Sequence, residues 1–242
     1  MNLSKTNILL AGVFLLANFA NAEVILSGAG SMARALTPKQ PDMEAASGVT
    51  IKIVSKNTGL GIKDLLAGKA NLAMVTGPLA LGCEVLEIPK SDASGLKASV
   101  VDTEGVSFIV HPDNTVSSLS AAQVKDIFTG KVTNWKDVGG ADLPIKVYAA
   151  ERSVGFRLAV EEQLLGGNNL VSTAEERSKS ADIIPAISQQ AGAIAFVANS
   201  DVKPGVKVIE SSAVSYPLQL VSKGEPTADE LKVIEAAKKA LQ

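Results

Sequence analysis

Three short polar turns could hold a small anion. Each follows an apolar run typical of a strand: residues 28–31 (Gly-Ala-Gly-Ser), 57–59 (Asn-Thr-Gly) and 76–78 (Thr-Gly-Pro). Such turns offer hydroxyl and backbone N–H groups, and glycine lets the backbone approach a ligand closely. We expect Ser31 to cap a helix whose first N–H groups and dipole favour an anion or another acceptor-rich ligand. For any single turn, the alternative is a strand–helix connection that binds nothing.

The first turn also fits the loose Gly-x-Gly-x-x-Ala form of the dinucleotide fingerprint. Residues 1–22 argue against a dinucleotide. Lys5 precedes an apolar run over residues 8–19, and an Ala-Asn-Ala cleavage pattern ends at Ala22. The run is too short to span a bilayer comfortably, and Glu23, rather than a lipid-attachment cysteine, follows the cleavage pattern. We therefore predict a cleaved signal peptide and a periplasmic chain without a lipid anchor, where nucleotide cofactors are scarce.

Composition argues against several other classes of function. The 242 residues carry 23 Lys and Arg against 25 Asp and Glu, and only 4% are aromatic. A nucleic-acid-binding surface would need clustered basic residues and aromatic side chains for stacking, so we expect no nucleic-acid partner. Cys83 is the only cysteine, which excludes an internal disulfide and suits a buried apolar filler. His111 is the only histidine, so we expect no metal and no cofactor.

The polar turns need a sheet that brings them together. Alternating residues predict a strand over residues 49–54, helical spacing predicts a helix over residues 60–66 that ends at Gly68, and residues 71–75 predict a buried strand. Repeated strand–turn–helix units imply a parallel sheet with helices on its faces. Ligands bind beyond the carboxyl ends of the strands in such sheets, so the turns are expected to converge on one edge.

A more specific motif lies in the second half of the chain. A predicted strand over residues 106–110 is followed by a predicted helix that begins with a capping box of Ser120 and Gln123 and ends at Gly130. Trp135 is expected to pack over that helix, and a ligand-stacking role for its indole is the alternative.

Residues 118–140 closely resemble the signature Leu-Thr/Ser…Ile-Phe-x-Gly-Lys-x-x-Asn-Trp-x-Asp-x-Gly-Gly of phosphate-type periplasmic substrate-binding proteins of ABC transporters. The likeness covers nearly the whole mature chain, including the first two turns, residues 192–196 (Gly-Ala-Ile-Ala-Phe) and residues 216–218 (Tyr-Pro-Leu). The resemblance implies an α/β, two-lobed periplasmic-binding-protein fold of type II, each lobe a mainly parallel sheet flanked by helices. Ligand would lie in the cleft between the lobes.

The resemblance also predicts how the chain divides. Lobe 1 is expected over residues 23–103 plus 196–242 and lobe 2 over residues 104–195, with crossings near residues 102–105 and 192–198.

The last helix is expected to pack back on the first lobe. A capping box of Thr227 and Glu230 would begin this helix. Its expected apolar face is formed by Leu231, Ile234 and Leu241.

The expected site departs from the family pattern. Phosphate binders usually carry an Arg, two residues and then Gly-Ser-Gly-Thr at the start of a second-lobe helix, where this chain has Ala-Glu-Arg-Ser-Val-Gly-Phe-Arg beginning at Ala150. Val154 and Phe156 replace the two hydroxyls, and Gly155 is kept. Gly77 stands where phosphate-specific members have an Asp that accepts the proton of hydrogen phosphate.

Two consequences follow for the ligand. Ser153 would cap the second-lobe helix, and Arg152 or Arg157 would restore positive charge unless both are solvated surface residues. A wall made more apolar by Val154 and Phe156 suits a ligand with an anionic or polar end and a less polar remainder. A different oxyanion held by Arg152 is the next possibility.

We predict a periplasmic solute-binding protein that captures a small anion or polar solute, acts as a monomer and serves an ABC permease or a sensor. It is not expected to be an enzyme, because no nucleophile–base pair is visible. The alternative is an exported non-transport binding or scaffold protein with the same fold and a degenerate pocket. The expected ligand-binding residues are Gly30, Ser31, Met32, Asn57, Thr58, Gly59, Thr76, Gly77, Arg152, Ser153 and Gly155.

Overall fold

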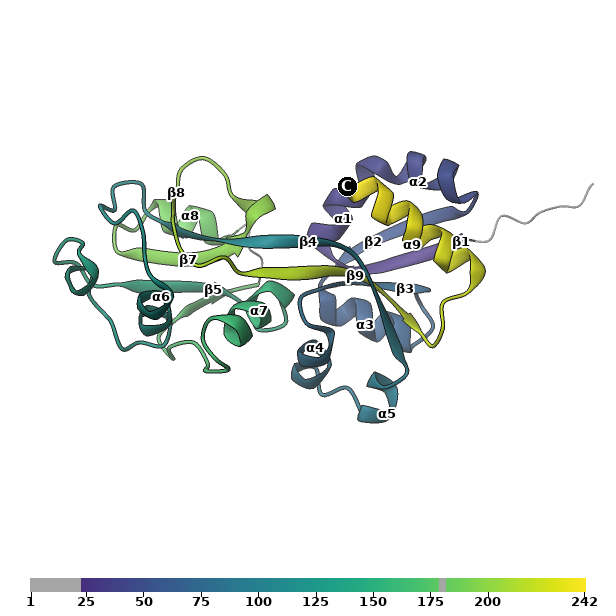
Figure 1. The fold of residues 1–242 in the computed structure, drawn as a ribbon, viewed down its shortest axis with the longest axis horizontal. Helices are drawn as coiled ribbons and strands as arrows, with labels where there is room; N and C mark the ends of the chain where they lie inside the picture. Colours follow the sequence, from purple (N-terminus) through teal and green to yellow (C-terminus); the bar gives the residue numbers. More distant parts are fainter. Residues whose placement is uncertain (1–22, 179–181) are drawn as a thin grey trace, which may run out of the picture.

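A computed structural model describes residues 23–178 and 182–242 (Figure 1). The predicted signal peptide lies outside these residues. Two groups of elements lie end to end in Figure 1, and two long strands, β4 (Leu96–Val110) and β9 (Ser215–Lys223), run between them. Within the described ranges, no helix combines the length and the apolar character needed to cross a membrane.

The first half of the molecule is built on three parallel strands. Their order is β2 (Thr50–Lys56), β1 (Glu23–Ala29) and β3 (Leu72–Thr76). The register places Ala29 beside Lys56, so the ends of β1 and β2 are level with each other. The turns after these strands therefore emerge at one edge of the sheet, as predicted.

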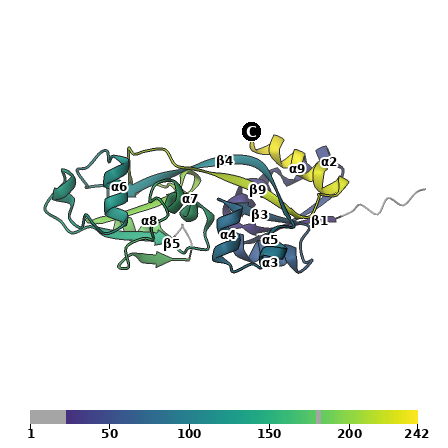
Figure 2. The same cartoon turned by 60° about the horizontal axis from the view of Figure 1, so that its bottom comes forward.

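Helices cover both faces of this first sheet, as the two views show (Figures 1 and 2). Residues alternate in direction along β3: Leu72 and Met74 join the main core, whereas Ala73 and Val75 join a second cluster that contains Cys83. The prediction that Cys83 is a buried filler is confirmed. The helices of this half are α1 (Gly30–Leu36), α2 (Gln40–Ser47), α3 (Thr58–Leu66), α4 (Leu79–Val85), α5 (Lys90–Ala93) and α9 (Ala228–Leu241), with a 3-10 turn η1 (Thr37–Lys39).

Helix α9 packs against the first half, as predicted, and its capping box is present. Its buried face is formed by Glu230, Val233, Ile234 and Ala237, which lie three or four residues apart. Leu231 was also predicted on this face, and this was wrong, because the residue is 47% exposed. It directly follows Glu230, so its side chain points to a different side of the helix.

The second half has its own mixed sheet. Strand β7 (Ala193–Ala198) pairs in parallel with β5 (Lys146–Ala150), and β5 pairs in parallel with β6 (Glu175–Arg177). The end of β4 pairs antiparallel with β7 on one side and with β8 (Lys207–Ile209) on the other. The helices here are α6 (Ala121–Phe128), α7 (Gly155–Gln163) and α8 (Ile183–Ser188), with 3-10 turns η2 (Trp135–Val138) and η4 (Asn199–Asp201).

The capping box of Ser120 and Gln123 forms as predicted. Trp135 is 1% exposed, and its Nε1 donates to the carbonyl oxygen of Gly192 at 3.0 Å. Its indole is therefore part of the core, and the ligand-stacking alternative is wrong.

The two halves are joined by the antiparallel ribbon of β4 and β9. Strand β4 pairs with β9 as far as Gly105 and with β7 from Val106 onward, where the first crossing was predicted. The second crossing, predicted at residues 192–198, was wrong. Residues 193–198 form β7, which is buried along its whole length and lies between β4 and β5, so the chain returns through β9. The lobe limit at 195/196 thus falls inside a strand, and the division into lobes stays a prediction.

Candidate functional site

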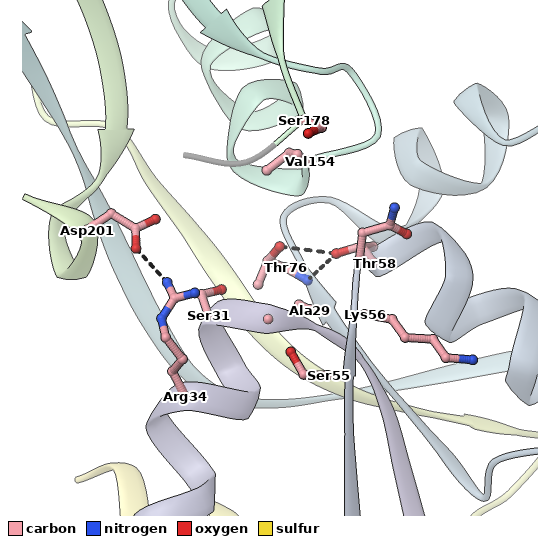
Figure 3. A pocket seen from close by; sticks show the side chains of 12 residues that line it. Ala29, Ser31, Arg34, Ser55, Lys56, Thr58, Thr76, Val154, Ser178 and Asp201 are labelled. Carbon is pink, nitrogen blue, oxygen red and sulfur yellow. Dashed lines mark hydrogen bonds and ion pairs between the residues drawn. The ribbon is translucent and has the colours of Figure 1, made fainter. Parts of the chain in front are cut away.

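A cavity of about 280 Å³ lies where the turns of the first half face the second half (Figure 3). Its volume lies just below the usual range of small-molecule sites, which is about 300–1,000 Å³. Residues from both halves line it: Ala29, Gly30, Ser31, Arg34, Ser55, Lys56, Asn57, Thr58, Thr76, Val154, Ser178 and Asp201. The predicted convergence of the three polar turns is confirmed, because each contributes at least one of these residues.

Five of the predicted site residues line this cavity, namely Gly30, Ser31, Asn57, Thr58 and Thr76. The others lie elsewhere, although several are close by. Met32 is fully buried in the core, and Gly59 lies against the side chain of Leu86. Gly77, Arg152, Ser153 and Gly155 are also outside the lining.

The helix starts differ in how they are capped. The side chain of Asn57 accepts a hydrogen bond of 2.8 Å from the backbone N–H of Leu60, which begins α3. Ser31 was predicted as a cap, and this was wrong: α1 begins at Gly30, so Ser31 is already in its first turn. Ser153 does not cap α7 either, because Val154 occupies that position.

Two threonine hydroxyls meet at the floor of the cavity. The Oγ1 atoms of Thr58 and Thr76 are 3.2 Å apart, and both residues are 5% exposed. Each hydroxyl has one hydrogen to donate. One hydrogen joins the two hydroxyls, so the other is left to donate to a ligand.

Charged residues flank these hydroxyls. Arg34 Nη2 lies 2.5 Å from Asp201 Oδ1, so an arginine of α1 pairs with an aspartate of the second half. Lys56 pairs with Asp64 at 2.5 Å, and Figure 3 shows its side chain pointing away from Arg34. The hydrogen bond from Lys56, followed by one from Ser27, lowers the pKa of Asp64 below its usual value.

Sequence reasoning missed Arg34, Ser55, Lys56, Ser178 and Asp201. Arg34 and Lys56 had a usable signal, because they are basic residues close to predicted turns. Asp201 also had one: it follows the apolar strand β7 within a polar Asn-Ser-Asp turn, which is the pattern used for the other three turns.

Glycines bring the two halves into backbone contact beside the cavity. A Cβ on Gly77 would lie 2.2 Å from the carbonyl oxygen of Gly155. An Asp at position 77 would therefore collide with the start of α7. Gly77 also has a φ of +84°, which disfavours any residue with a side chain.

The arginines near α7 serve other contacts. Arg157 is 5% exposed and donates to Glu161, Glu176 and the carbonyl oxygen of Ala150, so it is not the solvated residue that was the alternative. Arg152 pairs with Glu161 at 2.9 Å and lines a different groove, beside α4.

The expected apolar wall is only half present. Val154 lines the cavity, whereas Phe156 is 3% exposed and packs against Phe196 and Tyr216. Phe156 therefore belongs to the core. Within residues 23–178 and 182–242, no group of three His, Cys, Asp or Glu side chains is placed to hold a metal ion.

A family model described as the PBP superfamily domain matches residues 17–240. The chain belongs to the PBP superfamily. Among curated relatives, it is 31% identical over 124 residues to phosphate-binding protein PstS 2 of Streptococcus agalactiae, covering 50% of this chain and 39% of that protein. It is 27% identical over 184 residues to phosphate-binding protein PstS of Bacillus subtilis, covering 75% of this chain and 58% of that protein. The matches thus span about two fifths to three fifths of those relatives.

Solved structures agree with the sequence comparison. A putative phosphate ABC transporter substrate-binding protein with bound phosphate from Clostridium perfringens superimposes with a TM-score of 0.75 at 27% identity, covering 88% of this chain and 92% of that one. An ABC-type phosphate transport receptor from Vibrio cholerae gives 0.69 at 22% identity, covering 91% and 97%. The second likeness shows the fold alone. The predicted fold class and the resemblance to phosphate-type binding proteins are confirmed.

Proposed function

We propose that this protein is an exported solute-binding protein that captures a small oxyanion or organic anion in the cavity between its halves. It would act in the periplasm as a monomer and deliver the anion to an ABC permease or report it to a sensor. The observation that carries the proposal is the cavity itself, where Ser31, Thr58 and Thr76 from three separate turns meet Arg34. Binding and release, rather than catalysis, is the expected activity.

The lining suits an anion for a physical reason. Buried charge is costly unless hydrogen bonds replace the lost water, and each hydrogen bond to a charged group contributes about 1.5–3 kcal/mol. Hydroxyl and guanidinium hydrogens supply such bonds here. The relatives named as phosphate-binding proteins support the same class of ligand.

Inorganic phosphate is not expected to be held as the family pattern would hold it. The Arg, the Asp and both hydroxyls of that pattern are replaced at Ala150, Gly77, Val154 and Phe156. Phe156 faces the core, so the lining gives less support to a ligand with an apolar remainder than to a compact oxyanion. An oxyanion bound in this cavity would therefore contact a different set of residues from those of the family pattern.

The alternative remains an exported scaffold or binding protein with a degenerate pocket. One observation favours it: the cations beside the cavity, Arg34 and Lys56, each already pair with an aspartate. An anion would have to share Arg34 with Asp201.

Binding calorimetry separates the two proposals. Protein recovered after export would be titrated with phosphate, arsenate, sulfate and small carboxylates at neutral pH. Saturable binding of one anion per chain supports the solute-binding proposal. If no anion of the panel gives a heat larger than the heat of dilution, the solute-binding proposal is contradicted and the scaffold is favoured.

A further inference from the structure

Asp201 is the acidic residue of the cavity lining, and it comes from the second half of the molecule. Its side chain is 10% exposed, and its Oδ1 accepts the hydrogen bond from Arg34. Figure 3 shows the two side chains reaching toward each other along one side of the cavity. A carboxylate has two oxygens that can each accept more than one hydrogen bond. Among the described residues, the hydrogen bond from Arg34 is the one made to this carboxylate, so Oδ2 retains its capacity.

The turn that carries Asp201 is held in place by polar contacts on the ribbon between the halves. The backbone N–H of Ser200 donates to Glu104 at 2.9 Å, and the Tyr216 hydroxyl donates to the same carboxylate at 2.6 Å. Ser107 donates to Asn199 at 2.7 Å. Burial and the hydrogen bond to Glu104 raise the pKa of Tyr216, so this hydroxyl stays protonated as a donor. Both carboxylate oxygens of Glu104 therefore accept hydrogen bonds, and these contacts fix the turn from which Asp201 faces the cavity.

A carboxylate in this position constrains which anions fit. A fully ionised oxyanion would bring its lone pairs against those of Asp201, and like charges repel at short range. An anion that keeps one acidic proton can donate that proton to Oδ2 while its negative oxygens face Arg34 and the threonine hydroxyls.

We propose that Asp201 is the specificity-determining residue of this site, and that it accepts the proton of a monoprotonated tetrahedral oxyanion whose charge Arg34 binds. Hydrogen phosphate and hydrogen arsenate are of this class, whereas sulfate near neutral pH is not. This proton acceptor lies on the turn after β7, in the second half of the molecule. The family pattern has its acceptor in the first half, at the position of Gly77. This inference rests on the proposed function, because it names the ligand class of the same cavity.

The test compares inorganic phosphate with sulfate, which are similar in size and shape. Dissociation constants would be measured by calorimetry at neutral pH for the wild type and for Asp201→Asn, whose amide can donate to a fully ionised oxyanion. Sites built around one hydrogen bond reject an analogue that cannot make it, so the wild type should prefer phosphate by roughly 100-fold or more. In Asp201→Asn this preference should fall at least about tenfold, by weaker phosphate binding and stronger sulfate binding.

Asp229→Asn is the matched control, because Asp229 also accepts from a cationic side chain but lies on α9, away from the cavity. Its preference should equal that of the wild type. Asp201→Ala removes the acceptor without adding a donor and frees Arg34 for either anion, so the preference for phosphate over sulfate should fall about tenfold. This second variant keeps the test valid if Asp201→Asn fails to fold.

The outcomes separate the two proposals. An unchanged preference in folded Asp201→Asn or Asp201→Ala overturns the role of Asp201 and leaves the solute-binding function standing. So does a wild type that binds sulfate as tightly as phosphate. A wild type that binds no anion of the panel overturns the proposed function.

Discussion

Gly77 and Gly155 touch backbone to backbone across the junction of the two halves. A Cβ on Gly77 would lie 2.2 Å from the carbonyl oxygen of Gly155, and a Cβ on Gly155 would lie 1.5 Å from the carbonyl oxygen of Thr76. Each glycine thus allows a contact that any side chain would prevent. Gly77 is also fixed from its own half, since its N–H donates to the carbonyl oxygen of Pro217 and its carbonyl oxygen accepts from Gln219.

Gly77→Ala is therefore expected to destabilise the protein by more than backbone strain alone. Gly48→Ala is the matched control, because Gly48 also has a positive φ, +68°, but a Cβ added there would meet no atom within 4 Å. Both variants place alanine in the left-handed region, at a cost of about 1 kcal/mol. Overpacking should add about 1–3 kcal/mol at Gly77 alone. Urea unfolding of both variants measures the difference in the free energy of unfolding. Equal losses of stability would show that the backbone contact at Gly77 accommodates a side chain without added cost.

The hydroxyls of the cavity floor give a second prediction. The double variant Thr58→Ala/Thr76→Ala should weaken binding of the anion found by calorimetry by roughly tenfold or more. It removes the one hydroxyl hydrogen that this pair leaves for the ligand, and a hydrogen bond to a charged group is worth about 1.5–3 kcal/mol. Thr58→Ser keeps the hydroxyl and should bind within a few-fold of the wild type. Ser31→Ala should weaken binding similarly, with little change in melting temperature, since Ser31 caps no helix. Unchanged affinity in both alanine variants would move the site elsewhere.

Export gives a third prediction, which concerns residues outside the described ranges. N-terminal sequencing of protein recovered from the periplasm should begin at Glu23, because small residues at positions 20 and 22 fit the cleavage pattern. Ala22→Leu should block this cleavage and leave a longer chain in the membrane fraction. Protein that retains Met1 and is found only in the cytoplasm would contradict the prediction.

Local patterns predicted most of the fold. Strand alternation, the capping boxes at Ser120 and Thr227 and the convergence of the three turns follow from short-range chemistry. The second crossing was misplaced because a run of apolar residues such as 193–198 fits a joining strand and a central strand equally well. Only the pairing of β7 with both β4 and β5 decides between them.

Fewer of the site residues were predicted, because the site depends on contacts between residues that are far apart in the sequence. Arg34 and Asp201 are separated by 167 positions, and nothing local indicates that they meet. Phe156 and Arg157 follow one another in sequence, yet both are turned into the structure by partners on other elements, Phe196 and Glu176 among them. The resemblance to the family pattern placed these two positions beside the ligand. In the structure, both side chains pack elsewhere and neither lines the cavity.

Arg157 and Arg152 provide the last prediction, because both contact Glu161 in different surroundings. The side chain of Arg157 is 6% exposed, whereas that of Arg152 is 50% exposed. Arg157→Met would leave the buried carboxylate of Glu161 with only its exposed partner, and breaking a buried ion pair costs about 3–5 kcal/mol. Arg152→Met should cost about 1 kcal/mol or less.

The two arginine variants also test where the ligand lies. Neither side chain lines the cavity, so the anion affinity of folded Arg152→Met should match that of the wild type. Chemical unfolding gives the stabilities, and calorimetry gives the affinities. A large loss of affinity in Arg152→Met without loss of stability would restore Arg152 to the ligand site and place the bound anion in the groove beside α4.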